Sequence, residues 1–311
     1  MAEAVALAAL VLDGALGWPH WLHGRMGHPV GLFASVITAC EARWNRERWS
    51  DPARKAGGIA TVLVLIVLAG GASVMLTRVA GLVAGGNAWI LLAVLAWPAL
   101  AQRSLDQHFV PVIAALQDGD LGRARRSVGL IVGRDTATLD DAGIARAGIE
   151  SLAESFCDGV IAPLFWLIVA GLPGIWVMKA VNTADSLIGH KEAPYRHFGW
   201  AAARLDDAMV FLPARISALL ICLAGRGGLR IVRRDARAHA SPNAGWPESA
   251  MAGVLGIRLA GPVSYDGIIV DKPWIGDGAV ADVMAMLRAR RVYHRACLLG
   301  WAMAGAIAWL S

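Results

Sequence analysis

The chain has 311 residues, of which 57% are hydrophobic and 17% are charged, and its mean hydropathy is +0.53. Soluble domains carry about 25% charged residues, so this composition excludes an ordinary soluble domain and indicates an integral membrane protein. The helix-favouring Ala, Leu and Val content argues against a membrane β-barrel and predicts an all-α fold. The formal net charge of +5 comes from basic residues in loops beside apolar segments, which predicts cytoplasmic membrane anchoring and no nucleic-acid partner.

The first 55 residues predict a retained N-terminal helix and a basic cytosolic segment. Residues 1–12 are apolar, but they carry Glu3 where a signal peptide has a basic region, and no small-residue cleavage pattern follows. The basic run from Arg43 to Lys55 comes after a short apolar helix. Because cytoplasmic loops carry an excess of Lys and Arg, we expect this run in the cytosol.

Two apolar segments then predict a membrane hairpin. Residues 58–84 are long enough to span a bilayer, and Arg78 near the far end can extend its guanidinium to the interface. Gly85 and Gly86 interrupt the helix before the apolar segment 87–101. We therefore expect the chain to return to the side from which it started.

Two further regions are polar enough to lie in the cytosol. Residues 102–158 are amphipathic, with Thr138 placed as a helix N-cap, and predict a cytosolic helical layer. Residues 226–295 contain a basic run, a Pro/Gly-rich segment and a basic helix, and they precede a final apolar helix at 296–310. Together with the spans, these regions predict one membrane-embedded helical domain over residues 1–311.

The apolar stretch 159–181 has the sequence Gly171-Leu-Pro-Gly174 at its centre, where a helix is costly to continue. A single kinked span would place residues 182–206 on the outer side, whereas a re-entrant pair of half-helices would return them to the cytosolic side. We favour re-entry, because irregular backbone at membrane depth persists only where protein or a wet cavity covers it. The expected fold is a polytopic all-α bundle with amphipathic cytosolic helices and this re-entrant pair.

Three acidic residues recur every four positions and so form one stripe on a helix: Glu150, Glu154 and Asp158. Like charges at this spacing repel, so something must offset the repulsion. Mg²⁺, which takes a few carboxylates together with substrate phosphates, is the functional candidate. The alternative is a stripe that faces water or pairs with nearby arginines.

Polar residues within 179–216 present the same choice between function and helix capping. Asn182 and Asp185 are one turn apart directly after an apolar segment, where ionisable groups are functional by default, although either could cap a helix. Asp206 and Asp207 are expected to begin an apolar helix at 207–225. Negative charge there also suits the positive end of the helix dipole.

Basic side chains flank these aspartates at helical distances. Arg204 and Arg215 either clamp a phosphate or carboxylate or neutralise the aspartates. Further on, SPNAGWPES predicts a helix that starts at Pro247, and its free amides could hold an anion. No GxxxxGK[ST] motif and no GxSxG elbow occurs in the sequence, which excludes a P-loop ATP site and an α/β-hydrolase nucleophile.

Four long motifs follow one another along the chain: DGALGWPHWLHGRMGHPVG, GRDTATLDDAGIARAGIESLAESFCDGVIAPLFW, KAVNTADSLIGHKEAPYRHFGWAAARLDDAMVFLPARI and RRDARAHASPNAGWPESAMAGVLGIRLAGP. Together they closely resemble the adenosylcobinamide-phosphate synthase family of cobalamin biosynthesis, also called the CobD/CbiB family. The resemblance covers nearly the whole chain. Trp18 departs from it, since an acidic residue is expected there in many relatives.

The resemblance implies a multi-pass enzyme of the cell inner membrane whose active site faces the cytosol. Such an enzyme joins adenosylcobyric acid to (R)-1-amino-2-propanol phosphate, or to the free amino alcohol, through an amide. The family is assigned ATP and Mg²⁺, which make an activated acyl phosphate. Implied partners are the corrinoid, aminopropanol phosphate and membrane lipid, together with a second copy of the chain or other membrane-associated enzymes of the pathway.

The amide formation implied by the resemblance requires metal ligands, cations that neutralise phosphates and a base that keeps the attacking amine neutral. We expect Mg²⁺ at Glu150, Glu154, Asp158 and Asp185. Phosphate or carboxylate groups are expected at Lys179, Lys191, Arg204 and Arg215, and other substrate contacts at Asn182, Asn243 and Glu248. The expected catalytic groups are Asp206 or Asp207, as the base, and Lys191.

Two other functions suit the same residues. An intramembrane Mg²⁺-dependent transferase that acts on a lipid diphosphate would also need acidic stripes beside apolar helices. An ion-coupled transporter could use the broken helix and Asp185 as an ion site.

Overall fold

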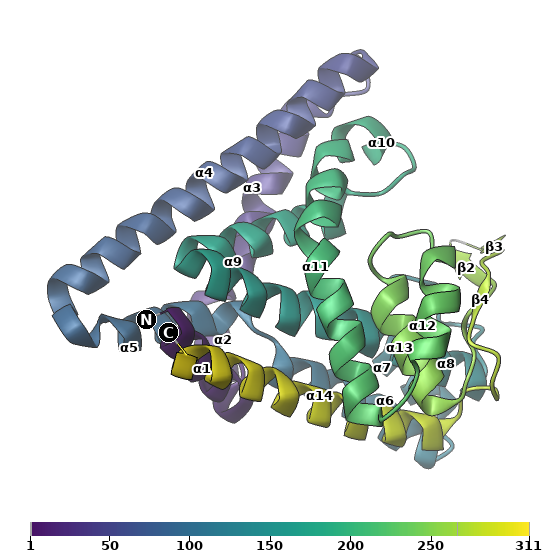
Figure 1. Cartoon of the computed structure of the whole chain (residues 1–311). Coiled ribbons are helices and arrows are strands. Elements are labelled where there is room, and N and C mark those ends of the chain that lie inside the picture. Colours follow the sequence, from purple (N-terminus) through teal and green to yellow (C-terminus); the bar gives the residue numbers. More distant parts are fainter. Residues whose placement is uncertain (1, 266, 311) are drawn as a thin grey trace. The chain divides into compact units, whose positions relative to one another are not determined.

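The chain is mostly helical (Figure 1). The computed structural model describes residues 2–265 and 267–310, and 78% of the chain is helical, which confirms the all-α prediction. Within these described residues, three helical stretches are long and apolar enough to cross a membrane: Asp51–Gln117, Asp141–Ile188 and Trp200–Gly225. A membrane protein is therefore the interpretation that fits both composition and structure.

The chain forms two compact units. The first contains Met1–Ala101, Ala162–Val210 and Ala304–Ser311, and the second contains Gln102–Ile161 and Phe211–Met303. The two regions predicted to be cytosolic, 102–158 and 226–295, both fall within the second unit. Whether the two units make one membrane domain stays a prediction.

The first unit is built from helices that the sequence places between its glycines and prolines. They are α1 (Ala2–Leu16), α2 (His20–Met26), α3 (Pro29–Trp44), α4 (Asp51–Ala84), α5 (Ala88–Ala96), α9 (Ala162–Ile188), α10 (Tyr195–Phe198) and the start of α11 (Trp200–Gly225), with 3-10 turns at Gly85–Asn87 and Trp97–Ala99.

The predicted break at Gly85 is confirmed, but the returning helix is shorter than expected. Helix α4 ends at Ala84, and Gly85 follows with a φ of 52°, which favours glycine. Helix α5 has nine residues. At 1.5 Å per residue it is about 13 Å long, less than half of a hydrocarbon core of about 30 Å, so α5 alone cannot complete the second leg of a hairpin.

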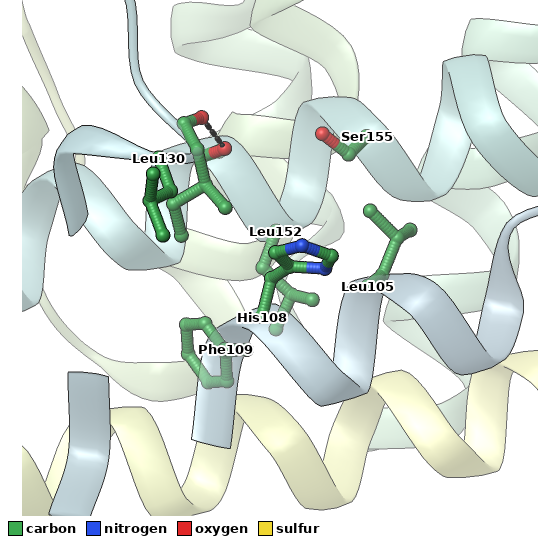
Figure 2. Close-up of a pocket in the computed structure, with 8 residues that line it drawn as sticks. Leu105, His108, Phe109, Leu130, Leu152 and Ser155 are labelled. Atoms are coloured by element: carbon green, nitrogen blue, oxygen red, sulfur yellow. Dashed lines mark hydrogen bonds between the residues drawn. The ribbon is translucent and has the colours of Figure 1, made fainter. Parts of the chain in front are cut away.

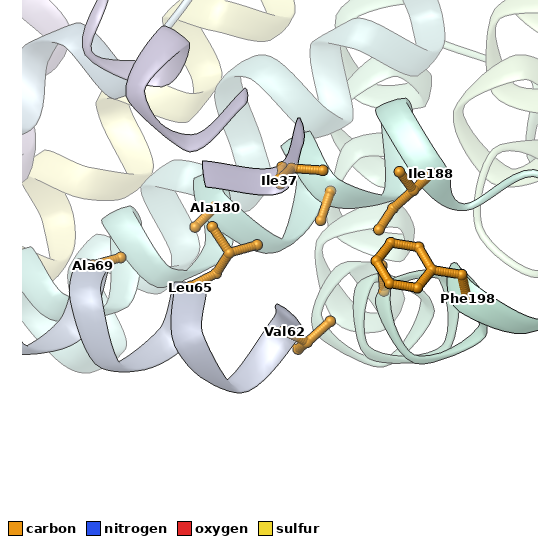
Figure 3. Packing of buried hydrophobic residues seen from close by; sticks show 9 residues of the cluster. Ile37, Val62, Leu65, Ala69, Ala180, Ile188 and Phe198 are labelled. Carbon is orange, nitrogen blue, oxygen red and sulfur yellow. The ribbon is translucent and has the colours of Figure 1, made fainter. Parts of the chain in front are cut away.

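A buried apolar cluster holds α3, α4, α9 and α10 together (Figure 3). Ile37, Leu65, Ile188 and Phe198 are each at most 1% exposed and come from these four helices. The close packing depends on Gly58, because a Cβ there would lie 1.7 Å from the carbonyl oxygen of Phe198. The cluster buries one face of α9, and the polar residues of α9 lie on the opposite face.

Helix α9 is broken where the sequence predicts it. Ala170 (φ −134°) and Gly171 (φ 62°) have non-helical backbone, and Pro173 follows. After the break the chain lies close to the preceding turn, since a Cβ on Gly174 would be 2.2 Å from the carbonyl oxygen of Trp166. The helix break is confirmed, while its re-entrant placement in a membrane stays a prediction.

The segment after α9 is attached to the start of α4. The carbonyl of Pro194 accepts hydrogen bonds from Asn45 Nδ2 (3.3 Å) and from the guanidinium of Arg54. Nearby, Lys55 Nζ lies 3.7 Å from the ring centroid of Trp200. Residues 194–200 are therefore on the same side of any membrane as the basic segment from Arg43 to Lys55.

The second unit contains helices and two short antiparallel hairpins. Its helices are α6 (Gln102–Gln117), α7 (Leu121–Gly129), α8 (Asp141–Phe156) with a π-helical turn at Cys157–Ile161, the rest of α11, α12 (Leu229–Asp235) with a 3-10 turn at Ala236–Ala238, α13 (Gly245–Leu255) and most of α14 (Val283–Leu310). Strand β1 (Leu259–Ala260) pairs with β4 (Trp274–Ile275), and β2 (Val263–Tyr265) pairs with β3 (Ile268–Val270).

Three boundaries differ from the sequence-based expectation. The N-cap of α8 is Asp140, whose Oδ1 accepts from the Gly143 amide at 2.7 Å, and not Thr138. Helix α11 begins at Trp200, before the expected start at 207, and the basic and apolar helices expected near the C-terminus form the single helix α14. Helices α11 and α14 continue past a polar stretch because their other faces are buried, whereas α8 starts two residues later than expected because Asp140 caps it.

We expect residue 193 to be on the cytosolic side, because its neighbour Pro194 is bonded to the basic segment at the start of α4. A single cysteine at position 193 in a cysteine-free background should react with a membrane-impermeant maleimide only in inverted vesicles or opened cells. Labelling from the periplasm of intact cells would show a single kinked span instead. A single cysteine at position 47, in the basic run, is the matched control.

Candidate functional site

A polar cavity of about 220 Å³ lies inside the second unit. It is bounded by α8, the segment after α7, the start of α13 and the hairpins. Six ionisable side chains line it: Arg134, Glu150, Glu154, His239, Glu248 and Lys272. The cavity thus brings three carboxylates together with an arginine, a lysine and a histidine.

The carboxylate of Glu150 is buried and has several hydrogen-bond and ion-pair partners. Glu150 is 4% exposed, and its Oε2 accepts from the guanidinium of Arg134. Its Oε1 accepts from the backbone amide of Ala260 at 2.6 Å, and Arg146 Nε lies 4.0 Å away. A buried carboxylate needs such partners, because an unpaired charge out of water is strongly disfavoured.

Glu154 lies one helical turn after Glu150, on the same face of α8, and it is exposed toward the cavity. Glu248 is in the first turn of α13, where the positive end of the helix dipole suits an acidic side chain. Burial, together with the charges of Glu150 and Glu154, raises the pKa of the Glu248 carboxyl well above its ordinary value. His239 Nε2 lies 3.9 Å from Glu248 Oε1.

These residues fit Mg²⁺ bound together with phosphate better than a metal held by protein alone. Within the described part of the chain, no group of three or more His, Cys, Asp or Glu side chains could hold a metal ion. Magnesium, however, is usually bound by one or two carboxylates and completed by water and substrate phosphates. Glu150, Glu154 and Glu248 can supply the carboxylates, while Arg134 and Lys272 can neutralise phosphate oxygens. The predicted metal ligands stay predictions.

Asp158 does not line the cavity with the other two acidic residues of its stripe. It lies in the π-helical turn at Cys157–Ile161, although it is near enough to interact with the charge of Glu154. A π turn holds more residues than an α turn, so positions after it leave the fourfold spacing of an α-helical face. The sequence pattern alone could not place this turn.

Two predicted substrate contacts, Arg215 and Asn243, are bonded to each other. Arg215 Nη1 donates to Asn243 Oδ1 (2.7 Å) and to the Phe211 carbonyl (2.8 Å), and Nη2 donates to the Pro242 carbonyl (3.2 Å). The guanidinium also stacks 4.4 Å from the ring centroid of Trp246. This arginine therefore anchors the segment before α13 to α11, and a substrate contact for either residue stays a prediction.

The remaining predicted residues gather in the first unit. Asn182 Nδ2 donates to Asp206 Oδ1 at 3.2 Å, which joins α9 to α11. Asp206 is 8% exposed, and Asp185 lies one turn after Asn182, close to the end of α9 at Ile188. Lys179, one turn before Asn182, lies near enough to His28 for its charge, after burial, to lower the pKa of that imidazole.

The structure does not use these polar residues as helix caps, the alternative role considered for them above. Asn182 and Asp185 lie within α9, and Asp206 and Asp207 lie in the second turn of α11 because that helix begins at Trp200. A carboxylate near a helix C-terminus, as at Asp185, faces the negative end of the dipole and is disfavoured without a compensating cation. A functional role for these residues stays a prediction.

Two exposed cations complete the group in the first unit. Arg204 of α11 and Lys191 of the loop after α9 both lie near enough to Asp207 to interact electrostatically with its carboxylate. For Arg204, no hydrogen bond or ion pair is found among residues 2–265 and 267–310. Its fork of donors is available for a phosphate or carboxylate.

Three residues of the polar cavity were not among the predicted site residues. Arg134 and His239 occur within the motifs that carry the family resemblance, so they could have been selected. Lys272 lies between β3 and β4, in the Pro/Gly-rich segment, and had no sequence signal. Its position depends on strand pairing that the sequence did not reveal.

Comparison with known proteins decides the family. The family model described as CobD/Cbib protein matches residues 6–293. The chain is 44% identical over 299 residues to a protein of Rhodobacter capsulatus named "Cobalamin biosynthesis protein CobD", covering 94% of this chain and 93% of the relative. The chain belongs to the CobD/CbiB family.

Other relatives with the same name agree with this assignment to the CobD/CbiB family. One of Rhizobium meliloti is 44% identical over 304 residues, covering 94% of this chain and 93% of the relative. One of Geobacter metallireducens is 43% identical over 283 residues, covering 89% and 87%. No solved structure matches the chain significantly.

The two arginines of α11 should respond differently to substitution by lysine. We expect Arg215→Lys to lower the apparent melting temperature in detergent by about 3–6 °C, since a hydrogen-bonded charged group contributes about 1.5–3 kcal/mol and lysine cannot keep the fork and the stack. Arg204→Lys, which loses no partner within the protein, should melt like the parent. Equal melting temperatures for both variants would contradict the anchoring role of Arg215.

Proposed function

We propose that this chain acts in cobalamin biosynthesis as an ATP-dependent amide-forming enzyme. It would join adenosylcobyric acid to (R)-1-amino-2-propanol phosphate, giving adenosylcobinamide phosphate, or to free aminopropanol, giving adenosylcobinamide. Support comes from membership of the CobD/CbiB family and from relatives named for cobalamin biosynthesis. The corrinoid is the implied large substrate.

The observation that carries the proposal is the polar cavity of the second unit. Its carboxylates Glu150, Glu154 and Glu248 suit Mg²⁺, and its cations Arg134 and Lys272 suit phosphate oxygens. A carboxylate and an amine do not condense favourably in water. ATP with Mg²⁺ would supply the driving force by converting the corrin carboxylate into an acyl phosphate.

The side chains of the cavity would then bind the magnesium ion and the phosphate groups and hold them in position. Arg134 is already fixed by Glu150, so its remaining donors are held in one direction at little entropic cost. Glu248, whose pKa is raised by burial and by the charges of Glu150 and Glu154, would be stabilised in its charged form by a bound cation, because a nearby positive charge offsets that repulsion. The cavity would therefore bind magnesium and phosphate cooperatively.

The polar group of the first unit would serve the other reacting partner or the corrin carboxylate. Arg204 and Lys191 offer exposed positive charge, and Asp185 offers a negative one near a helix end that disfavours it. From the sequence, Asp206 or Asp207 is the candidate base. We further propose that both groups face the cytosol at the inner membrane, since ATP and the corrin acid are cytosolic.

The direct test uses purified protein with ATP, Mg²⁺, adenosylcobyric acid and aminopropanol phosphate. Mass spectrometry should detect adenosylcobinamide phosphate and equimolar consumption of ATP. Free aminopropanol in a parallel reaction distinguishes the two acceptors. If neither acceptor is converted while ATP and the corrinoid are both bound, the proposed reaction is wrong.

Removal of single charges should abolish the reaction. Glu154→Gln and Asp185→Asn keep the size of each side chain and remove its charge, so we expect each to lower amide formation below detection while the protein stays folded in detergent. For Glu154 the cause is lost metal binding in the cavity, and for Asp185 it is the lost negative charge of the first-unit group. Activity should be measured at saturating Mg²⁺ alongside melting temperature. Near-normal turnover in both variants would make the two carboxylates structural.

Substitution of Arg204 by lysine should lower kcat/KM about ten-fold or more, the effect of a transition-state interaction of about 1.4 kcal/mol, because a point charge cannot replace a bidentate fork. Arg123 and Arg126, which are exposed on α7, provide the control. Their double replacement by lysine should stay within a few-fold of the parent, since anionic lipid headgroups accept either cation. Arg125 is left unchanged, because its Nε donates to the Leu139 carbonyl at 2.8 Å.

A further inference from the structure

A second cavity of about 250 Å³ adjoins the polar one within the second unit (Figure 2). It lies between α6 and α8, and its walls include Leu105, His108, Leu152 and Ser155. The two cavities share Ile131 and Ser151 in their linings. The Ser151 hydroxyl donates to the Ile131 carbonyl at 2.6 Å, so one hydrogen bond forms part of the wall between them.

The geometry of α8 explains why the cavities adjoin. Consecutive helix residues are about 100° apart, so the face with Glu150 and Glu154 is next to the face with Ser151 and Ser155. The first face lines the polar cavity and the second lines the smaller one. Ligands in the two cavities would therefore lie on neighbouring faces of one helix.

His108 presents a free nitrogen acceptor to this cavity. Its Nδ1 lies 2.7 Å from the carbonyl oxygen of Ser104, and because a carbonyl only accepts, Nδ1 carries the proton. The other ring nitrogen, Nε2, is then unprotonated in the neutral imidazole and has no partner among the residues that the structure describes. Figure 2 shows the ring turned into the cavity.

Ser155 differs from most other helical hydroxyls of this chain. Seven Ser or Thr side chains donate to the carbonyl four residues earlier in their helix: Ser35, Thr61, Ser73, Thr77, Thr183, Ser186 and Ser217. Ser155 makes no such bond in the described chain, and its hydroxyl faces the cavity (Figure 2). It is available to a ligand as donor or acceptor.

The lining defines the chemical class of the ligand. A volume of about 250 Å³ is below the range of drug-sized pockets, about 300–1,000 Å³, and suits a molecule with few heavy atoms. Leu105 and Leu152 offer an apolar surface to a methyl group, and Ser155 offers a partner to a hydroxyl or ester oxygen. None of the lining residues is acidic, so the walls of this cavity favour the neutral amine over the ammonium ion, whose nearest carboxylates are in the adjoining polar cavity.

We propose that this cavity holds the amine-bearing end of the amino alcohol and that His108 Nε2 removes its ammonium proton. The inference rests on the proposed function. The proton passes from R–NH₃⁺ to Nε2, and the lone pair of the neutral amine forms the C–N bond to the activated corrin carboxyl carbon. The C–O bond to phosphate breaks, its electron pair leaves with the phosphate, and the second amine proton leaves on that phosphate.

Histidine is better suited to this step than the aspartates of α11. An imidazole nitrogen is by its chemistry a stronger base than a carboxylate oxygen, so it accepts the proton of an ammonium ion more readily. His108 is also in the same unit as the cavity that would hold the acyl phosphate. Asp206, in contrast, already accepts the amide N–H of Asn182.

Hydroxylamine gives a sharp test, because it is uncharged at neutral pH and needs no base before it attacks an acyl phosphate. His108→Gln should lower amide formation about 100-fold, within the usual range for a general base, while hydroxamate formation from adenosylcobyric acid, ATP and hydroxylamine stays within a few-fold of the parent. Ser155→Ala should raise the KM for the amino alcohol several-fold and leave that for ATP unchanged. His23→Gln, at an exposed histidine of α2, is the control and should match the parent in both assays.

The outcomes separate the two proposals. Absence of amide product with the parent protein overturns the proposed function and this inference with it. If the parent is active and His108→Gln keeps its amide rate, or loses hydroxamate and amide formation equally, His108 is not the base. If His108→Gln cannot be purified in a folded state, an unchanged KM for the amino alcohol in Ser155→Ala overturns the assignment of the cavity.

Discussion

The removal of Glu150 from water is the constraint on which the second unit depends. A buried carboxylate persists only if donors surround it, and here they are the guanidinium of Arg134 after α7, the backbone amide of Ala260 in β1 and, more distant, Arg146 one turn earlier on α8 itself. Arg134 and Ala260 each draw their own segment toward α8. The residues after α7 and the pair of strands β1–β4 are thereby assembled around one charge.

Much of the helical organisation follows from local chemistry in the sequence. The breaks at Gly85 and Gly171 were predictable, because glycine tolerates positive φ and proline stops a helix. The acidic repeat predicted that Glu150 and Glu154 share a face. These features depend on residues that are close together in the chain, so a single sequence is enough to predict them.

Other features depend on contacts between distant segments and could not be predicted in this way. The approach of Lys272 to α8 follows from strands of two or three residues that are too short to show a pattern, and that of His239 and Glu248 follows from the packing of α13 on α8. The start of α11 at Trp200 and the π turn at Cys157–Ile161 are set by packing and not by caps. The predicted site residues consequently separate into one group in each unit, a division that spacing along the chain did not suggest.

The length of α4 has a consequence for how a large, water-soluble substrate meets a membrane protein. Its 34 residues correspond to about 51 Å, whereas the hydrocarbon layer is about 30 Å thick. The predicted span begins at residue 58 and is about 40 Å long, so it would tilt in such a layer, and residues 51–57 would extend about 10 Å beyond the acyl chains. Because Pro194 is bonded at this basic end of α4, the loop with Lys191 is held at the same height. In the proposed reaction a corrinoid would therefore meet these cations at the level of the headgroups, without giving up its own hydration to the acyl chains.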